Sequence, residues 1–362
     1  MKRVYIDGFS LVNKELFGIH RFTYEILKEL DRLIHKGEVV LLIPEDGEKD
    51  FEFCNIEVRK LRRSNLLKNH KWLRAILWTR LGFVSYVRAH RGLAMDCLLS
   101  VSFLPSDIFF YYDCIKERVP QNADTRFQKI ERICHIICTF MNVKFSKKVV
   151  TISNYSRKDI MDYYHIPSGK FAIVYTSWEH FNRVKADSGI LEKYGLKKGE
   201  YCFSLGSRYY HKNFRWIAEA AIQNPQYVFV VSGSNLLSSS DSALDEKKPQ
   251  NMIFTGYLSD GEIKALMQNC KVFIQPSLYE GAGMPPMEAM STGARCIVAN
   301  ATSLPELYRD SVWYIDPKKY DAIEIDQIMK PEIEDNDQVL KRYSWKKSAE
   351  RVYQVIRAVK SS

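Results

Sequence analysis

The hydrophobic positions of this chain form short continuous runs, separated by segments in which apolar residues recur every three or four positions. Runs of about four to eight apolar residues indicate buried strands, and the longer spacing indicates amphipathic helices. In the first half, runs typical of strands occur at residues 3–6, 39–43, 96–103, 107–112, 149–152 and 171–175. A helix pattern from Arg21 to Ile34 separates the first two runs. This strand–helix–strand order predicts a parallel sheet with right-handed crossovers.

The second half repeats the pattern. Its strand-like runs are residues 201–205, 227–232, 252–256, 271–275, 295–299 and 312–315. Charged residues before Gly199 fit a linker between the halves. A terminal helix follows Tyr343, and its apolar face (Ala349, Val352, Val355 and Ile356) predicts packing against the first half. Because 362 residues exceed one ordinary core, we expect an α/β protein with domains at 1–180 and 181–342 and a returning helix at 343–362.

Composition is typical of a globular protein from a reducing compartment. Hydrophobic residues make up 46% of the chain and charged residues 27%, and no stretch reaches the ~18 consecutive apolar residues of a membrane span. The charged first residues, followed by Asp7 and Gly8, do not resemble a signal peptide. Eight cysteines stand apart in apolar runs, as reduced core cysteines of cytosolic proteins do. Cys134-His135-x-x-Cys138 lacks a second ligand pair, so we expect no zinc site there.

The formal net charge is +10, and part of the excess is concentrated between Arg59 and Arg91. This segment contains ten Lys or Arg residues and no Asp or Glu, interleaved with Trp72, Trp78, Phe83 and Tyr86. Three interpretations are open: a solvated basic helix, a nucleic-acid patch, or contact with an anionic membrane surface. No nucleic-acid motif accompanies the segment and its aromatic residues have helical spacing, so we favour the membrane surface.

Residues suited to chemistry are densest at positions 279–293. Glu280 is followed by Gly281-Ala282-Gly283, two prolines and a helix-forming segment that contains Glu288. Glycines allow a ligand to approach the backbone, and a helix start offers free N–H groups and a positive dipole end that suit a phosphate. Carboxylates repel phosphate but accept hydrogen bonds from hydroxyls, so a sugar nucleotide fits both features. The alternative interpretation is a buried turn with two solvent-exposed glutamates.

The segment Glu280-Gly-Ala-Gly-Met-Pro-Pro-Met-Glu288-Ala-Met resembles the signature of the retaining glycosyltransferases of family 4. The resemblance implies a GT-B fold, with two Rossmann-like domains whose parallel sheets face each other across a cleft. It implies that the N-terminal domain binds an acceptor and the C-terminal domain a nucleotide-sugar donor. Glu280 is then expected to orient the donor sugar and Glu288 its ribose. The residues expected close to the diphosphate are Gly281, Ala282, Gly283 and Met284.

A second anion-binding pattern follows the first strand of the second half. There Gly206-Ser207-Arg208 precedes His211 and Lys212, and a helix pattern begins at Phe214. A lysine in this place neutralises the charge that develops on a departing diphosphate, and Lys212 matches the lysine of the resembling family. Many family members have Arg where this chain has Ser207, so Arg208 and His211 are alternatives for a second positive charge. The other interpretation of Lys212 is a solvent-exposed helix cap.

The resemblance also implies donor contacts elsewhere in the second half. Gly233 ends a strand-like run, and Tyr257 and Leu258 lie in a stretch that borders the nucleotide base in the family. Thr302 and Ser303, after another strand-like run, are suited to donate hydrogen bonds to the diphosphate.

The first half matches the family more loosely. Gly18-Ile19-His20-Arg21 resembles a loop near donor phosphate and acceptor, and an ordinary helix start is the alternative. Asp113 follows a strand-like run, at the edge where open α/β sheets bind ligands. Many family members have His-Asp where this chain has Tyr112-Asp113. We therefore expect Asp113 either to activate an acceptor hydroxyl or to hold the site in shape.

The resemblance, taken with these patterns, implies a retaining, metal-independent glycosyltransferase with Lys212, Glu280 and Asp113 as catalytic residues. The expected reaction moves a hexose from a UDP-, GDP- or dTDP-sugar to a saccharide or lipid-linked acceptor, without cofactor, metal ion or nucleic acid. By analogy with bacterial cell-surface polysaccharide assembly, and from the basic segment 59–91, we expect a cytoplasmic protein at the inner face of the cell membrane.

Three alternatives are weighed against this prediction. A metal-dependent transferase is suggested by Asp335-Asn336-Asp337, which has the letters of an Asp-x-Asp motif but lies in an acidic, turn-like stretch. A nucleotide-sugar epimerase of related fold would lack the arrangement of Glu280 and Glu288. A glycan- or nucleotide-binding protein without activity would share the same site residues.

Overall fold

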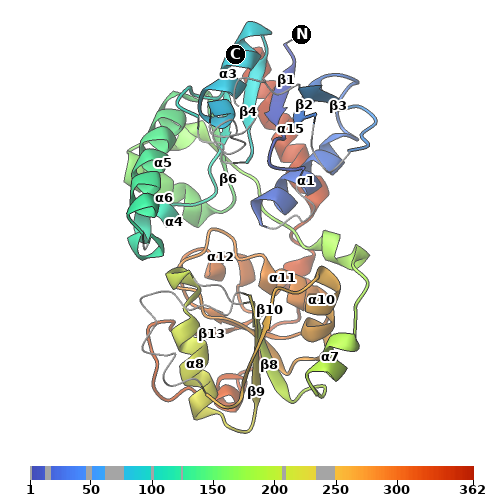
Figure 1. Cartoon of the computed structure of the whole chain (residues 1–362), viewed down its shortest axis with the longest axis vertical. Helices are drawn as coiled ribbons and strands as arrows, with labels where there is room; N and C mark the ends of the chain where they lie inside the picture. Colours follow the sequence, from blue (N-terminus) through green and yellow to red (C-terminus); the bar gives the residue numbers. More distant parts are fainter. Residues whose placement is uncertain are drawn as a thin grey trace. The chain divides into compact units, whose positions relative to one another are not determined.

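The computed structural model describes residues 2–12, 18–45, 51–61, 77–98, 102–123, 125–205, 209–233 and 249–362. The chain divides into two compact units, each built around one parallel sheet (Figure 1). Unit 1 comprises residues 1–113, 130–176 and 345–362, and unit 2 comprises residues 114–129 and 177–344. Residues 114–129, expected in the N-terminal domain, thus belong to the unit that holds the second half of the chain.

Unit 1 contains a seven-stranded sheet in the order β3-β2-β1-β4-β5-β6-β7, and all of its strand pairs are parallel. The strands are β1 (Val4–Asp7), β2 (Val39–Pro44), β3 (Glu57–Leu61), β4 (Leu93–Asp96), β5 (Ile108–Phe110), β6 (Lys148–Thr151) and β7 (Phe171–Ile173). The two central strands β1 and β4 are buried along their whole length, whereas the edge strand β3 is only partly buried. Continuous apolar runs therefore mark the strands that are covered on both faces.

Helices cover the sheet of unit 1. They are α1 (Ile19–Leu30), the π-helical segment η2 (Trp78–Gly82), α3 (Phe83–Ala89), α5 (Arg126–Phe145), α6 (Asn154–Tyr164), the short η4 (Ser168–Lys170) and α15 (Trp345–Ser361). The first turn of α5 is grouped with unit 2. The Ser153 hydroxyl accepts a hydrogen bond from the Ser156 N–H at 3.0 Å, which explains why α6 begins there.

The last helix, α15, lies beside α1 in unit 1 (Figure 1). The rings of Phe22 and Trp345 meet edge to face with centroids 5.7 Å apart. The Ser348 hydroxyl donates to the Tyr175 carbonyl at 2.6 Å. The end of the helix is held by an ion pair of 2.6 Å between Lys360 and Glu38, whose side chains are both buried. The apolar face predicted from the sequence is thus the face of α15 that packs against the rest of unit 1.

The strand expected at residues 96–103 is wrong. Asp96 ends β4, which begins at Leu93 and pairs with β1 and β5. Residues 97, 98, 102 and 103 are not in a strand, and residues 99–101 lie outside the described residues. The apolar run was read as one strand because periodicity alone does not locate where a strand ends.

Unit 2 contains a six-stranded parallel sheet in the order β10-β9-β8-β11-β12-β13. Its strands are β8 (Tyr201–Leu205), β9 (Val228–Ser232), β10 (Met252–Gly256), β11 (Val272–Gln275), β12 (Cys296–Ala299) and β13 (Trp313–Ile315). Its helices are α4 (Ile115–Arg118), η3 (Pro120–Asn122), η5 (Glu179–Arg183), α7 (Gly189–Lys193), η6 (Tyr210–Lys212), α8 (Phe214–Gln223), α10 (Asp260–Asn269), α11 (Pro285–Ser291), α12 (Leu304–Tyr308), α13 (Ile325–Ile328) and α14 (Asp337–Leu340).

Each sheet has one point at which the strand order reverses direction. In unit 1 this point lies between β1 and β4, and in unit 2 it lies between β8 and β11. Open parallel sheets bind ligands outside the carboxyl ends of the strands at this point, because the two flanking loops diverge there and leave a crevice. The α/β class expected from the sequence, with two parallel sheets, is confirmed.

Among the helices of the described residues, none combines the length and the apolar composition that crossing a bilayer requires.

Candidate functional site

Lys212 and Glu280 meet at the point of strand-order reversal in unit 2. Lys212 lies in η6 after β8, and Glu280 lies in the loop after β11. The Nζ atom of Lys212 donates to Oε1 of Glu280 at 2.7 Å. The Lys212 side chain is 26% exposed and the Glu280 side chain 10%. The pair is therefore largely desolvated, while the ammonium group keeps access to solvent and to a ligand.

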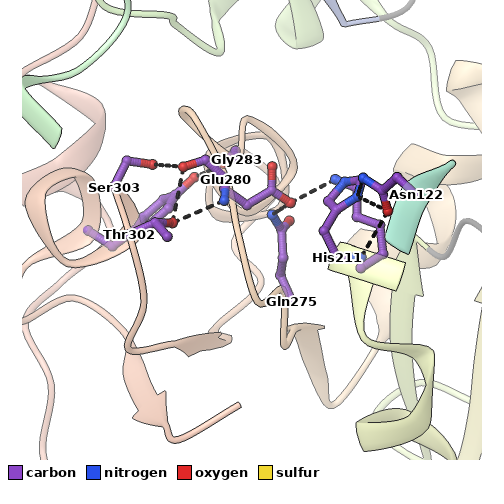
Figure 2. A network of polar contacts seen from close by, with 9 residues as sticks. Asn122, His211, Gln275, Glu280, Gly283, Thr302 and Ser303 are labelled. Atoms are coloured by element: carbon purple, nitrogen blue, oxygen red, sulfur yellow. Dashed lines mark hydrogen bonds and ion pairs between the residues drawn. The ribbon is translucent and has the colours of Figure 1, made fainter. Parts of the chain in front are cut away.

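The carboxylate of Glu280 is held from its other side as well. The Gln275 side-chain amide donates to the same Oε1 atom at 3.0 Å, and Figure 2 shows this side chain rising from β11 toward the carboxylate. Because Gln275 is buried and β11 lies in the middle of the sheet, the acceptor atom is fixed by a rigid part of unit 2.

The backbone of Glu280 is anchored by two hydroxyl side chains. The Glu280 N–H donates to Oγ1 of Thr302 at 3.0 Å, and the Glu280 carbonyl accepts from Thr302 at 3.0 Å and from Ser303 at 2.8 Å (Figure 2). Thr302 has a φ of 52°, in the left-handed region. Both hydroxyls thus hold the Glu280 loop, and their expected contact with a diphosphate stays a prediction.

The Lys212 ammonium decides the charge of Glu280. Burial by itself raises the pKa of a carboxyl group, since it removes the charged form from water. At Glu280 the positive charge of Lys212 and its hydrogen bond outweigh this effect, and the pKa lies below the ordinary value. The site therefore presents a carboxylate anion beside an ammonium cation at neutral pH.

Gly283 shows why the loop before α11 needs glycine. Its φ is 59°, and a Cβ atom there would lie 2.6 Å from Cδ2 of Leu304 and 2.9 Å from Nε2 of Gln275. Its carbonyl accepts a hydrogen bond from the Tyr308 hydroxyl. Gly281 and Ala282 are buried in the same loop, and Met284 is the N-cap of α11. Close packing, rather than an open turn, explains the glycine at this position.

His211 supports the pair from the chain segment before α8. Nδ1 of His211 accepts from the Asn122 side-chain amide at 3.0 Å, and the His211 carbonyl accepts from the Leu278 N–H at 2.7 Å (Figure 2). Burial, together with the nearby charge of Lys212, lowers the pKa of His211 to about 4. His211 is therefore neutral at pH 7 and does not supply the second positive charge considered for it.

Asn213 fixes the end of η6. It has a φ of 55°, which a side chain tolerates when it bonds locally to backbone. Its amide donates to the carbonyls of Pro276 at 2.9 Å and Pro317 at 2.7 Å. Lys212 is thus tied to the loop of Glu280 by its neighbour as well as by its own ion pair.

Glu288 has a partner outside this network. It lies in the first turn of α11, and its Oε1 atom lies 2.9 Å from Nε2 of His180 in η5. The His180 side chain is 2% exposed and that of Glu288 12%. The structure thus gives the two glutamates of the sequence motif different partners, and neither is an unsupported surface side chain.

Other predicted donor contacts lie at the same edge of the sheet. Gly233 follows β9 and donates its N–H to the Gly256 carbonyl at 2.9 Å. Tyr257 and Leu258 follow β10, and Tyr257 is 84% exposed. Gly206, Ser207 and Arg208 lie outside the described residues.

In unit 1 the structure indicates a residue that sequence analysis missed. Asp7 ends β1 at the reversal point of that sheet, is buried, and accepts hydrogen bonds from the Phe9 N–H and from Nε1 of Trp78, both at 3.1 Å. The rings of Phe9 and Trp78 are stacked with centroids 4.5 Å apart. The signal available in the sequence was the acidic residue that follows the first strand-like apolar run.

The two predicted site residues of unit 1 lie at other strand or helix ends. Asp113 is half-buried after β5. Gly18 is the N-cap of α1 with a φ of 50°, and its carbonyl accepts from the Phe22 N–H at 2.9 Å. Among the described residues, no atom would lie within 4 Å of a Cβ at Gly18, so the positive φ is what favours glycine there.

Within the part of the chain that the structure describes, no group of three or more His, Cys, Asp or Glu residues is arranged to hold a metal ion. Asp337, of the Asp-x-Asp sequence, forms an ion pair of 2.9 Å with Lys341 one turn along α14, and both side chains are exposed. This is an ordinary surface pair of a helix.

Comparison with known proteins agrees with this geometry. Residues 190–356 match the family model described as glycosyl transferases group 1. The chain is 29% identical to the O-antigen chain mannosyltransferase B of Escherichia coli over 335 residues, which cover 85% of each chain.

The fold is shared with solved glycosyltransferase structures. Sucrose-phosphate synthase of Thermosynechococcus elongatus superposes with a TM-score of 0.73 at 13% identity over 100% of both chains. HepE of Anabaena, solved in complex with UDP and glucose, superposes with a TM-score of 0.66 at 12% identity over 99% of this chain and 100% of its own. At such identities the likeness shows a GT-B fold. Together with the match over residues 190–356 and the mannosyltransferase relative, it shows that this chain is similar to the group 1 glycosyltransferases.

Proposed function

We propose that this chain is a retaining, metal-independent transferase that moves a hexose from a nucleotide sugar to a saccharide or lipid-linked saccharide acceptor. The observation that carries the proposal is the pair of Lys212 and Glu280 at the reversal point of the unit 2 sheet. A cation and a carboxylate side by side suit a ligand that bears a diphosphate and hydroxyl groups.

In the proposed reaction each of the two partners contacts a different part of the donor. Lys212 takes up the negative charge that appears on the diphosphate as the glycosidic bond breaks, and this stabilises the transition state more than the ground state. Glu280 accepts hydrogen bonds from the sugar hydroxyls and so orients the anomeric carbon. Glu288, held by His180, accepts from the ribose hydroxyls. The acceptor hydroxyl attacks from the face on which the diphosphate leaves, and the anomeric configuration is retained.

The donor sugar that we propose is mannose, because the relative aligned over 85% of this chain is named a mannosyltransferase. We assign the contacts with the nucleotide base to Gly233, Tyr257 and Leu258, which follow β9 and β10. These contacts would be made mainly by backbone groups. The candidate nucleotides are UDP, GDP and dTDP, since all three present the same diphosphate to Lys212.

For the acceptor we propose the carboxyl edge of the unit 1 sheet. Asp7 lies at the reversal point there, next to the stacked rings of Phe9 and Trp78. Aromatic faces and carboxylates are the groups with which proteins hold sugars, since sugars have apolar C–H faces and hydroxyl edges. Asp113 follows β5 of the same sheet. In this proposal it either activates the acceptor hydroxyl or holds the acceptor site in shape. The enzyme would then work in the cytoplasm on acceptors for cell-surface polysaccharide, at the inner face of the membrane.

The experiment is to incubate the protein with UDP-, GDP- and dTDP-hexoses, GDP-mannose among them, and to measure release of the nucleoside diphosphate in excess EDTA. We expect turnover of one donor at the same rate with and without EDTA, and release of the sugar with the anomeric configuration of the donor. Loss of activity in EDTA that manganese restores would contradict metal independence. An inverted product would contradict retention, and no turnover of any donor, with or without metal, would favour a binding protein.

A further inference from the structure

Helix α5 exposes apolar side chains along one face, unlike most helices on a globular domain. Helices on such domains bury apolar residues and expose polar ones. In α5 the buried residues include His135, Thr139 and Asn142, whereas Ile130, Ile133, Ile137 and Phe140 are between 38% and 66% exposed. Those four positions follow each other at spacings of three and four residues, so they form one stripe along the helix. The stripe lies within unit 1.

Three more exposed apolar side chains of unit 1 lie on or beside η2. Leu77, Leu81 and Phe103 are each about 45% exposed. The loop at Phe103 joins η2 to α5, because the Phe103 N–H and the Ser102 hydroxyl both donate to the Arg80 carbonyl, and the Ser102 carbonyl accepts from the side chain of Asn142 at 2.7 Å. Because Asn142 lies on the buried face of α5, these side chains form an exposed apolar group separate from the stripe. Exposed apolar patches such as the stripe on α5 mark interaction surfaces.

Basic residues border the apolar stripe. Residues 126–148 contain six Lys or Arg and one acidic residue, Glu131. The Lys144 ammonium lies 5.2 Å from the ring centre of Phe140 and 5.7 Å from that of Phe145. One of these cations, Lys147, forms an ion pair of 3.6 Å with Asp107. A helix with an outward apolar stripe bordered by cations is suited to lie in the headgroup region of an anionic bilayer.

We propose that unit 1 docks on an anionic lipid surface through the outward face of α5. A second copy of this chain fits less well, because it would bring the same positive charge against this face. The proposal deepens the proposed location of the enzyme but is independent of the transfer reaction. It also places the membrane contact mainly on α5, whereas the sequence indicated residues 59–91, of which 62–76 lie outside the described residues. Figure 1 shows α5 at the margin of unit 1 beside α6, and the rings of Phe140 and Tyr164 join the two helices.

The test is flotation of the full chain with vesicles of phosphatidylglycerol and phosphatidylcholine in equal parts, and with vesicles of phosphatidylcholine alone. The variant combines Ile133→Ser, Ile137→Ser and Phe140→Ser. Its matched control is Ile222→Ser, a side chain with 48% exposure on α8 of unit 2. The melting temperature and the binding of nucleoside diphosphate, both measured without vesicles, report on folding and on the donor site.

We expect the wild type and I222S to float with the anionic vesicles, and the triple variant to bind them about 100-fold more weakly, because three half-exposed apolar side chains no longer enter the lipid. Lys144→Gln should weaken binding about fivefold, and added salt should weaken the binding of wild type. Unchanged flotation of the triple variant, equal binding to uncharged vesicles, or no flotation of the wild type would overturn the proposal. Dimerisation of wild type that the triple variant loses, without flotation, would assign the face to a second copy instead. Because nucleotide binding is measured separately, a negative result in the flotation test does not affect the proposed donor chemistry, which has its own test.

Discussion

The ammonium group of Lys212 lies 2.7 Å from Oε1 of Glu280, although 68 positions separate the two residues in the chain. They meet because β8 and β11 are neighbours in the sheet, so the loops that follow these two strands begin side by side at the reversal point. The same carboxylate accepts from Gln275, and its backbone is held by Thr302 and Ser303. A cation that can bind a leaving diphosphate is thus held in place by a carboxylate that can bind the sugar.

Lys212→Ala should abolish most turnover. Removing a cation that stabilises developing charge in a desolvated site costs about 100- to 1,000-fold in rate. Nucleoside diphosphate release from the donor measures this effect. The matched control is Lys271→Ala, because Lys271 forms an ion pair with Asp326 at 3.2 Å and has a similar exposure of 28%. K271A should keep the wild-type rate, and an equal loss in both variants would show that any lost ion pair in unit 2 has this effect.

The stability of the same variants should separate structure from chemistry. K212A leaves the Glu280 carboxylate buried without its cation, which we expect to destabilise the protein by about 2 kcal/mol, since breaking buried pairs is costly. In the double variant K212A/E280Q the buried charge is absent, so the free energy of unfolding should largely recover while turnover stays lost. Denaturant unfolding provides the measurement. If turnover recovered together with stability, the pair would have only a structural role.

Acid should destabilise the protein through His211. Its pKa is about 4 in the folded state against 6.5 for an unperturbed histidine, so between these values the unfolded chain binds a proton that the folded chain does not. The free energy of unfolding is therefore unaffected by this residue above pH 6.5. It decreases as pH falls toward 4, by about 3 kcal/mol in total. The lowered pKa of Glu280 acts in the same direction at the acid end.

The variant His211→Gln isolates the histidine. Glutamine does not titrate, so the free energy of unfolding should change less between pH 6.5 and 5 than in the wild type, while the fall caused by Glu280 at lower pH is kept. Urea unfolding at a series of pH values measures both curves. Parallel curves for the two proteins would contradict a neutral, buried His211.

Glu288 should determine whether the site recognises ribose hydroxyls. We expect the wild type to bind its nucleoside diphosphate about 10- to 100-fold more tightly than the 2′,3′-dideoxy analogue, because a carboxylate left without its hydroxyl partners is penalised. Glu288→Ala should lose this preference. Glu288→Gln, which keeps an oxygen for His180, should retain part of it and the wild-type melting temperature. A variant E288A that still discriminates between the two ligands would assign the ribose to another residue.

The sequence predicted the parts of the fold that local patterns determine. Continuous apolar runs located most strands, and the motif around Glu280 singled out the loop that carries the site. Contacts across long chain separations were not accessible from one sequence. His180 lies 108 positions before Glu288, and Asn122 lies 89 positions before His211. Nothing local marks either residue as a partner, and residues 114–129 were for the same reason expected in the first domain.

One local prediction failed for an identifiable physical reason. The strand expected at residues 96–103 came from an apolar stretch that continues beyond the true strand end at Asp96. Thr302 and Ser303 were expected at a phosphate, which stays a prediction, and the sequence did not indicate that their hydroxyls bond the backbone of Glu280. Small hydroxyl side chains in loops bond nearby backbone readily, and the sequence does not say which backbone that is.

The central claim, that Lys212 binds the donor diphosphate, is tested most directly by calorimetric titration of the wild type, K212A and K271A with the nucleoside diphosphate that the donor screen identifies and with the parent nucleoside. The account predicts that K212A binds the diphosphate about 10- to 100-fold more weakly than the wild type, that K271A is unchanged, and that the three proteins bind the nucleoside alike. Equal affinity of K212A and the wild type for the diphosphate would contradict it.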